Sequence, residues 1–198
     1  MAFSDNVWWT RKARIQTEKR LLANAFHSQL LLLWFSFCAV AVSVYYMKFD
    51  QTALGGELAG ITWVVYSVLV LCMSGFISGL SFKERAGLVK ESYEAINSIY
   101  QKANIANADI GGLAVEYDQL LGLCENHSDN DYYQTLCIEY ATCIGQIDQA
   151  TKLKDGLDRR PTWYHWVSIT WWTIRRYTLF TALYALPILI FFIMELWS

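Results

Sequence analysis

The sequence has few charged residues and few prolines. Charged residues make up 17% of the 198 residues, while 55% are hydrophobic, 16% are aromatic and two are proline. A single small soluble core does not need this much apolar mass, so part of the chain is predicted to lie in a lipid bilayer. The formal net charge of −2 also gives no overall attraction to nucleic acid.

Sequence patterns for catalysis are missing as well. The histidines are His27, His127 and His165. None of them belongs to a nucleophile elbow, a His-Glu-x-x-His helix or a Gly-rich phosphate loop. We therefore expect a protein that is not an enzyme and that binds no cofactor.

The five cysteines form no Cys-x-x-Cys pair, which excludes a thioredoxin-like motif and gives no sign of a disulfide framework. Cys124, His127, Cys137 and Cys143 could hold zinc only at a spacing that is not standard. Cys124 and Cys137 also fit apolar helix faces, where a free cysteine behaves as a small hydrophobic residue. We expect no metal site.

Three apolar stretches are long enough to cross a bilayer, namely 29–47, 58–82 and 177–197. The first two are joined by a short polar segment with a Gly55-Gly56 turn signal, which predicts a transmembrane helical hairpin. The third contains Pro187, and a kink is expected there because proline leaves a backbone carbonyl without its helical partner. A buried hairpin or re-entrant helix is the alternative for this third stretch.

Basic residues gather on one side of these stretches, before the first, after the second and before the third. They are Arg11, Lys12, Arg14, Lys19, Arg20, Lys83, Arg85, Lys90, Arg159, Arg160, Arg175 and Arg176. Positive residues near the ends of spans are retained in the cytoplasm. Residues 1–26 also lack the pattern of a cleavable signal peptide, so we expect a cytoplasmic N-terminus and a C-terminus on the opposite side of the membrane, which is the periplasm if the membrane is a bacterial inner membrane.

Residues 4–26 are predicted to form a basic amphipathic helix, in which Trp8, Ile15 and Leu22 are spaced by seven on one stripe. Such a helix either lies on the anionic inner leaflet or packs on the cytosolic helices while its charges set the topology. The sequence leaves both alternatives open.

Residues 83–158 are predicted to form a cytosolic antiparallel helical hairpin, because apolar residues recur at helical spacing on both sides of a polar turn at 125–131. Gly111-Gly112 either breaks the first helix or is a weak point within it. Asn, Asp and Ser in the turn are expected to cap the return helix. The return helix is predicted to carry one apolar face, made of Tyr133, Leu136, Cys137, Tyr140, Ile144 and Ile147.

Residues 159–176 form an aromatic segment that is predicted to lie at the inner membrane interface, with Trp163, Trp166 and Trp171 on one helix face. Tryptophans near Arg159 and Arg160 can also stack on single-stranded nucleic acid. Anchoring is the favoured interpretation, and direct contact with nucleic acid is left open.

The second predicted span has a face of small residues, Ser74, Gly75, Ser78 and Gly79. Small residues let the backbones of membrane helices approach closely, either within the hairpin or between copies in a homo-oligomer. The spans contain no Asp, Lys or Arg, so the charges that coupled transport usually requires are missing.

Several short motifs resemble a known family. The runs Trp9–Arg14 and Glu18–Leu21, then Gly79–Arg85 and Ser92–Ile96, resemble the segments flanking the two spans of the SLATT domain, a family of bacterial membrane effectors. A polar turn is similar to one in a subgroup encoded beside reverse transcriptases; it contains Glu125, Asn126, His127, Asp129 and Asp131.

The resemblance implies an antiphage effector that oligomerises in the bacterial inner membrane and permeabilises it, killing or arresting the infected cell. It further implies that a retron reverse transcriptase with its RNA–DNA hybrid holds the effector inactive, with Arg11, Lys12, Arg14, Lys19, Arg20, Arg159 and Arg160 setting topology or facing that partner. The chain has no nucleotide-binding motif or appended sensor, which favours control by a separate protein. The alternative is a membrane scaffold whose cytosolic helices recruit a partner without forming a pore.

Overall fold

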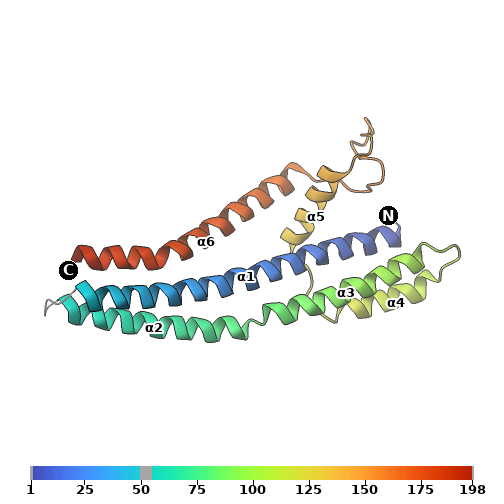
Figure 1. Cartoon of the computed structure of the whole chain (residues 1–198). Helices are drawn as coiled ribbons and strands as arrows, with labels where there is room; N and C mark the ends of the chain where they lie inside the picture. The colour runs from blue at the N-terminus through green and yellow to red at the C-terminus, as the bar shows by residue number, and fades with distance from the viewer. Residues whose placement is uncertain (1, 50–54, 198) are drawn as a thin grey trace. The chain divides into compact units, whose positions relative to one another are not determined.

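The computed structural model describes residues 2–49 and 55–197, and this part of the chain is almost entirely α-helical (Figure 1). Among the described residues, the only β-bridge joins Ile147 to Lys154. The prediction of an all-α membrane protein is confirmed. The helices are α1 (Phe3–Phe49), α2 (Gly55–Gly79), α3 (Phe82–Ala103), α4 (Ile110–Leu121), α5 (Asp129–Thr142) and α6 (Trp163–Trp197).

The chain divides into two compact units. The first unit contains Met1–Ala23 and Phe82–Ile174, and the second contains Asn24–Ser81 and Arg175–Ser198. Helices α1 and α6 each contribute residues to both units.

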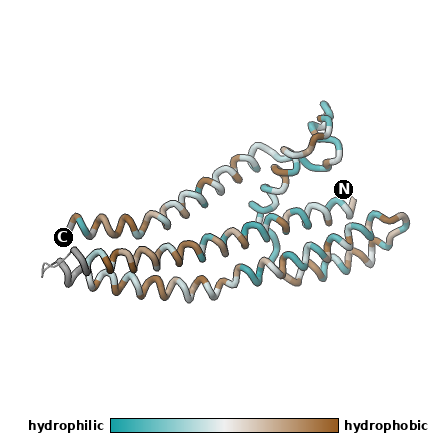
Figure 2. Tube along the Cα trace, viewed as in Figure 1, coloured by the Kyte–Doolittle hydropathy of each residue, from teal (hydrophilic) through white to brown (hydrophobic). Residues whose placement is uncertain are grey.

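The second unit contains the apolar stretches. Helices α1, α2 and α6 are each long and apolar enough to cross a membrane, and Figure 2 shows hydrophobic residues concentrated in α2 and toward the C-terminal ends of α1 and α6. Helix α2 ends at Gly79, three residues before the predicted end, because the chain turns at Ser81 with φ of 44°. The predicted connection between the first two spans includes residues 50–54, which lie outside the described part.

The boundary predicted between a basic helix at 4–26 and a span at 29–47 does not exist. Residues 3–49 form one helix, since His27 and Ser28 are compatible with helical backbone and neither glycine nor proline interrupts the region. The basic helix and the first span are therefore one element.

Helix α6 packs along α1 within the second unit. Asn24 accepts a hydrogen bond from Arg176. The His27 ring stacks on the Phe180 ring with centres 4.4 Å apart, and the rings of Tyr45 and Phe191 pack edge to face with centres 5.4 Å apart. Contacts that advance in the same order along both helices mean that α1 and α6 run parallel.

Pro187 lies inside α6, which is one helix rather than a hairpin. The helix continues past Pro187 and changes direction toward its C-terminal end (Figure 1). In the preceding turn, the carbonyl of Tyr184 accepts a hydrogen bond of 3.0 Å from the Trp34 indole of α1. A neighbouring helix thus provides a polar partner one residue past Leu183, the residue whose carbonyl loses its helical donor at Pro187.

The antiparallel hairpin of the first unit is made by α3 and α4. Ile96, Ile99 and Leu113 are buried in its core. The reversal occurs at residues 104–109, earlier than the predicted turn at 125–131. Asp109 caps α4 by accepting from the backbone of Gly112, and a side chain at Gly112 would lie 2.7 Å from Asp109 Oδ2, so the capping carboxylate would have to shift.

The N-terminal part of α1 packs on this hairpin, which is the second of the two alternatives for the basic helix. The buried stripe is Val7, Arg14 and Leu21, and the predicted stripe was displaced from it by one residue. Leu22, a member of the predicted stripe, is 46% exposed.

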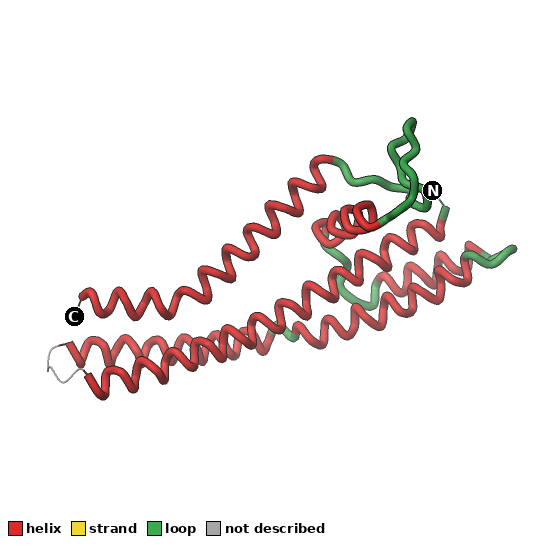
Figure 3. The backbone as a smooth tube through the Cα atoms, turned by 45° about the horizontal axis from the view of Figure 1, so that its top comes forward, coloured by secondary structure: helices red, strands yellow, loops and turns green. Residues whose placement is uncertain are grey.

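Helix α5 is shorter than the predicted return helix and makes its polar contacts with α1. It ends at Thr142, and the chain then continues without helix to Thr162 (Figure 3). Ile144 is fully exposed, so its place on an apolar helix face was wrong. The Lys154 ammonium instead caps α5 by donating to the carbonyls of Tyr140 and Cys143 at 2.7 and 2.8 Å.

Candidate functional site

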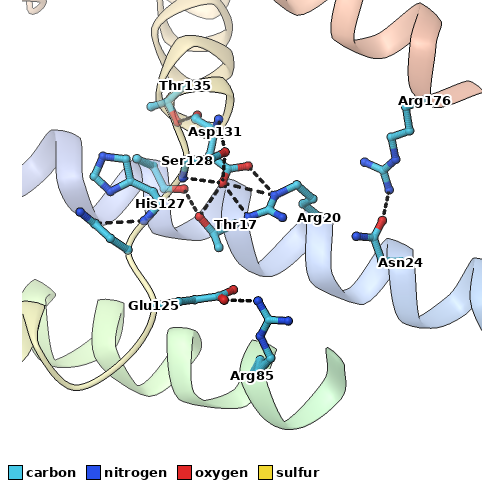
Figure 4. Close-up of polar contacts among 12 residues, drawn as sticks. Thr17, Arg20, Asn24, Arg85, Glu125, His127, Ser128, Asp131, Thr135 and Arg176 are labelled. Carbon is cyan, nitrogen blue, oxygen red and sulfur yellow. Dashed lines mark hydrogen bonds and ion pairs between the residues drawn. The ribbon is translucent and has the colours of Figure 1, made fainter. Parts of the chain in front are cut away.

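A buried carboxylate, Asp131, joins α5 to α1 in the first unit (Figure 4). Its oxygens accept hydrogen bonds from Arg20 at 2.9 and 3.0 Å and from the Thr17 hydroxyl at 3.0 Å. Asp131 also forms a capping box with Ser128, in which each side chain binds the other's backbone N–H. One side chain therefore both starts α5 and fixes it to α1.

The hydrogen bonds of Asp131 outweigh the effect of its burial. Burial alone raises the pKa of a carboxyl, but bonds from Arg20 and Ser128 favour the ionised form, and the net pKa of Asp131 is lowered. Asp131 is therefore ionised at neutral pH and paired with the Arg20 cation.

A second polar contact joins α1 to the α3–α4 hairpin. The Arg14 side chain is fully buried and donates to the Ser92 hydroxyl of α3. It also donates to the carbonyls of Leu120 and Leu121, at 3.3 and 3.2 Å, where α4 ends. A cation at a helix C-terminus satisfies carbonyls that have no partner within the helix.

The polar turn before α5 lies between these two contacts. Glu125 pairs with Arg85 of α3, and the buried Nδ1 atom of His127 has no hydrogen-bond partner within the described residues. Burial lowers the pKa of His127, and the nearby Arg14 cation lowers it further. Asn126 and Asp129 are exposed, so the turn is part structural and part accessible.

Most of the basic residues predicted to face a partner are engaged within the chain. Lys12 pairs with Glu139 at 2.7 Å, and Arg159 donates to the Tyr132 hydroxyl at 2.8 Å. Arg14 is fully buried, so its side chain is not accessible to another molecule in this structure.

Three basic residues of that set remain to be placed. Lys19 and Arg160 are exposed, and Arg11 is half-buried. Lys19 and Arg160 are therefore the members that remain accessible to another molecule, while the role of the whole set in topology stays a prediction.

The small-residue face of α2 is exposed. Ser74, Gly75, Ser78 and Gly79 all lie on the surface of the chain. A Cβ atom built at Gly75 or Gly79 would meet no atom within 4 Å. Among the described residues, nothing approaches the two glycines closely enough for tight helix packing, which argues against their packing inside the hairpin.

The cysteines near the turn do not assemble with His127. Within residues 2–49 and 55–197, no three His, Cys, Asp or Glu residues lie where they could hold a metal ion. Burial raises the pKa of the Cys137 thiol to about 11, which keeps it protonated, whereas metal ligation requires the thiolate.

The aromatic segment predicted at the membrane interface lies in the first turns of α6. Trp163 and Trp171 are 79% and 67% exposed, and Trp166 is exposed as well. On the opposite side of the helix, His165 stacks on Tyr133 of α5 at 4.5 Å. The face that carries Trp163, Trp166 and Trp171 is therefore not buried against other described residues of the chain.

The predicted turn at 125–131 includes Asp129 and Asp131, which belong to the first turn of α5, and sequence reasoning missed the residues that hold them. Ser128 was identifiable from its spacing, because Ser-x-x-Asp before a helix is a capping-box pattern. Thr17 and Ser92 carried no such signal, since their partners lie 114 and 78 residues away.

The described chain has no strands and three apolar helices long enough to cross a bilayer, together with a polar helical unit joined by the ion pair of Arg20 with the buried Asp131. This arrangement defines an all-α integral membrane protein. The chain belongs to the SMODS and SLOG-associating 2TM effector domain family 5, whose family model matches residues 2–194. The resemblance to the SLATT family is thereby confirmed. No curated protein and no solved structure shows a significant match.

The family assignment makes this chain a membrane effector in antiphage defence. The family is not known as a catalytic one. Its description names two transmembrane segments, whereas the matched range here includes the third apolar helix, α6, almost to its end.

Proposed function

We propose that this effector oligomerises in the bacterial inner membrane through α2 and permeabilises the membrane, which kills or arrests the infected cell without any catalytic step. The observation that carries the proposal is the exposed pair Gly75 and Gly79, at each of which an added Cβ atom would meet no atom of the described residues within 4 Å outside its own helix turn. In lipid, where apolar surface gives no hydrophobic drive, such close-approach sites are a main source of helix association.

The proposed orientation has the N-terminus and the first unit in the cytoplasm and the C-terminus in the periplasm. The distribution of basic residues supports the first part. The parallel packing of α1 and α6 supports the second, because two parallel spans cross a membrane in the same direction.

A retron reverse transcriptase with its RNA–DNA hybrid is proposed as the partner that holds the effector inactive. The family motifs of the polar turn suggest it, and the accessible side chains Asn126, Asp129, Lys19 and Arg160 offer contacts of both signs. Helix α1 carries Arg14, Thr17 and Arg20, and farther along it carries the first span. A partner that alters α5 or the turn therefore acts on the same helix that enters the membrane.

Membrane potential tests the proposal. The chain is induced in bacteria alone, and together with a reverse transcriptase and its RNA encoded beside it, while a voltage-sensitive dye is followed. Depolarisation is expected when the chain is produced alone. When it is produced together with the reverse transcriptase and its RNA, depolarisation is expected only after phage infection. Absence of depolarisation under every condition contradicts permeabilisation. Depolarisation that the reverse transcriptase does not suppress contradicts only the proposed control.

A scaffold that recruits a partner without forming a pore is the competing function. The exposed apolar side chains of α4 and its following turn, such as Val115 and Leu123, are compatible with recruitment. Partner capture without depolarisation, both unchanged by substitution of Gly75 and Gly79, is the result that favours the scaffold.

A further inference from the structure

A cavity of about 430 Å³ lies in the first unit. It is lined by the first turns of α1, by the C-terminal end of α3 at Tyr100 and by the non-helical segment before α6. Its side chains are chiefly aromatic and acidic: Asp5, Trp8, Trp9, Tyr100 and Asp158. None of the lining residues is basic. The volume lies within the range of about 300–1,000 Å³ that small-molecule sites occupy.

The two indole rings of the cavity already attract cations of the same chain. The Lys12 ammonium lies 5.1 Å from the centre of the Trp8 ring, and the Arg159 guanidinium lies 5.6 Å from that of Trp9. The rings are packed edge to face, with centres 4.8 Å apart. Their electron-rich faces are therefore held in fixed directions, as recognition of a cation requires.

Polar groups remain available in the cavity. The Trp9 indole donates to Asp158, which fixes that carboxylate, and Asp5 uses only its Oδ2 atom, to accept from the backbone of Ala2. Within the described part of the chain, Asp5 Oδ1 and the Tyr100 hydroxyl have no hydrogen-bond partner. The Tyr100 hydroxyl can donate or accept a hydrogen bond, whereas the Asp5 carboxylate oxygen only accepts and favours a positively charged donor.

We propose that this cavity binds an organic cation, a guanidinium or alkylammonium group that lies against Trp8 and pairs with Asp5. Asp158 already pairs with Arg159 at 3.4 Å, so Asp5 is the lining carboxylate that has no ion pair among the described residues, and its charge disfavours an anion. The group can come from a basic side chain of a protein or from a free polyamine, and both offer the same chemistry. Because α1, α3 and the segment leading to α6 all line the cavity, a bound cation links these segments to one another.

Fluorine NMR on the full chain in detergent micelles, labelled with 5-fluorotryptophan, tests the proposal. The Trp8 resonance is assigned by its loss in Trp8→Phe. N-acetyl-arginine amide is titrated, and N-acetyl-citrulline amide, which has a similar shape but no charge, is the control. A saturable shift of the Trp8 resonance is expected with the arginine compound and none with the citrulline compound. Equal responses to the two compounds, or none to either, overturn the proposal.

The variant Asp5→Asn identifies the carboxylate. Loss of a partly exposed charge pair is expected to weaken binding about fivefold, whereas Asp118→Asn, at an exposed position on α4, leaves binding unchanged. Equal affinity of Asp5→Asn and the unaltered chain contradicts the assignment. Spermidine and an acetylated Gly-Arg-Gly amide are then compared, and the tighter of the two indicates whether the source is a polyamine or a protein side chain.

Discussion

Arg20 and Asp131 form an ion pair of 2.9 Å between α1 and α5, and the carboxylate side of the pair is almost completely buried. The two residues are 111 positions apart in the sequence. The pair fixes the start of α5, and with it the polar turn, to a helix that carries the first span.

Asp131→Asn is expected to destabilise the first unit. The substitution removes the charge that compensates Arg20, and breaking a buried pair from one side costs about 3–5 kcal/mol, reduced here because Arg20 is partly exposed. The check is thermal unfolding in detergent, with Asp129→Asn as the matched control, because Asp129 is exposed in the same helix turn. Equal melting temperatures for the two variants contradict a structural role for the pair.

Arg14→Met is expected to lower stability by about 2–4 kcal/mol, since the Ser92 hydroxyl and the carbonyls of Leu120 and Leu121 lose a charged donor in a buried site. Lys19→Met, on the same helix but exposed, is expected to change stability little. Chemical unfolding followed by circular dichroism separates the two. A Lys19 effect as large as that of Arg14 argues against the assigned contacts.

The sequence predicted the helices better than it predicted which face of α1 is buried. A basic residue on an apolar stripe is normally assigned to solvent, so Arg14 was placed outside and the stripe was set one residue too late, on Trp8, Ile15 and Leu22. The guanidinium is in fact buried because Ser92 and the C-terminal carbonyls of α4 surround it. Such a site is built from segments that are far apart in the sequence, so the local spacing of residues in α1 cannot predict it.

The α3–α4 hairpin and the turn before α5 also depend on contacts that local sequence patterns do not predict. Apolar periodicity correctly predicted antiparallel helices, and the Asn, Asp and Ser residues correctly predicted a capped helix start. The pairing was assigned to the wrong helices, because the reversal at 104–109 has fewer turn-forming residues than the segment 125–131. The end of α5 depends on Lys154 and on Gly145, where a side chain would lie 2.5 Å from the Asp155 carbonyl oxygen.

His127 is expected to make the stability of the first unit depend on pH. Burial and Arg14 lower its pKa, so the folded chain holds fewer protons than the unfolded chain. The contribution of neutral His127 to the free energy of unfolding is therefore complete above the pKa of about 6.5 in the unfolded chain. It is lost as the pH falls through the lower pKa of His127 in the folded chain. Melting temperatures between pH 7.5 and 5 are expected to fall less steeply for His127→Gln than for the unaltered chain. Parallel curves would show that the His127 proton is not linked to folding.

Gly75→Leu with Gly79→Leu is expected to abolish association of copies in the membrane while leaving the fold of each copy unchanged, because a Cβ atom at either position would meet no atom of the described residues within 4 Å. Gly60→Leu is the matched control, since Gly60 lies in the same helix and also has no neighbour within 4 Å. Chemical crosslinking in native membranes provides the measurement. Loss of crosslinked species in both the double variant and the Gly60→Leu control, or in neither, contradicts a specific role for the Gly75–Gly79 face.

The most direct measurement of the central claim is ion flux through liposomes that contain only the purified chain. Potassium efflux is expected, rising more steeply than linearly with the protein-to-lipid ratio because several copies make each pore, and it is expected to be absent for the Gly75→Leu, Gly79→Leu double variant. Liposomes that stay sealed at every ratio, or flux that the double variant does not reduce, would contradict permeabilisation through association of α2.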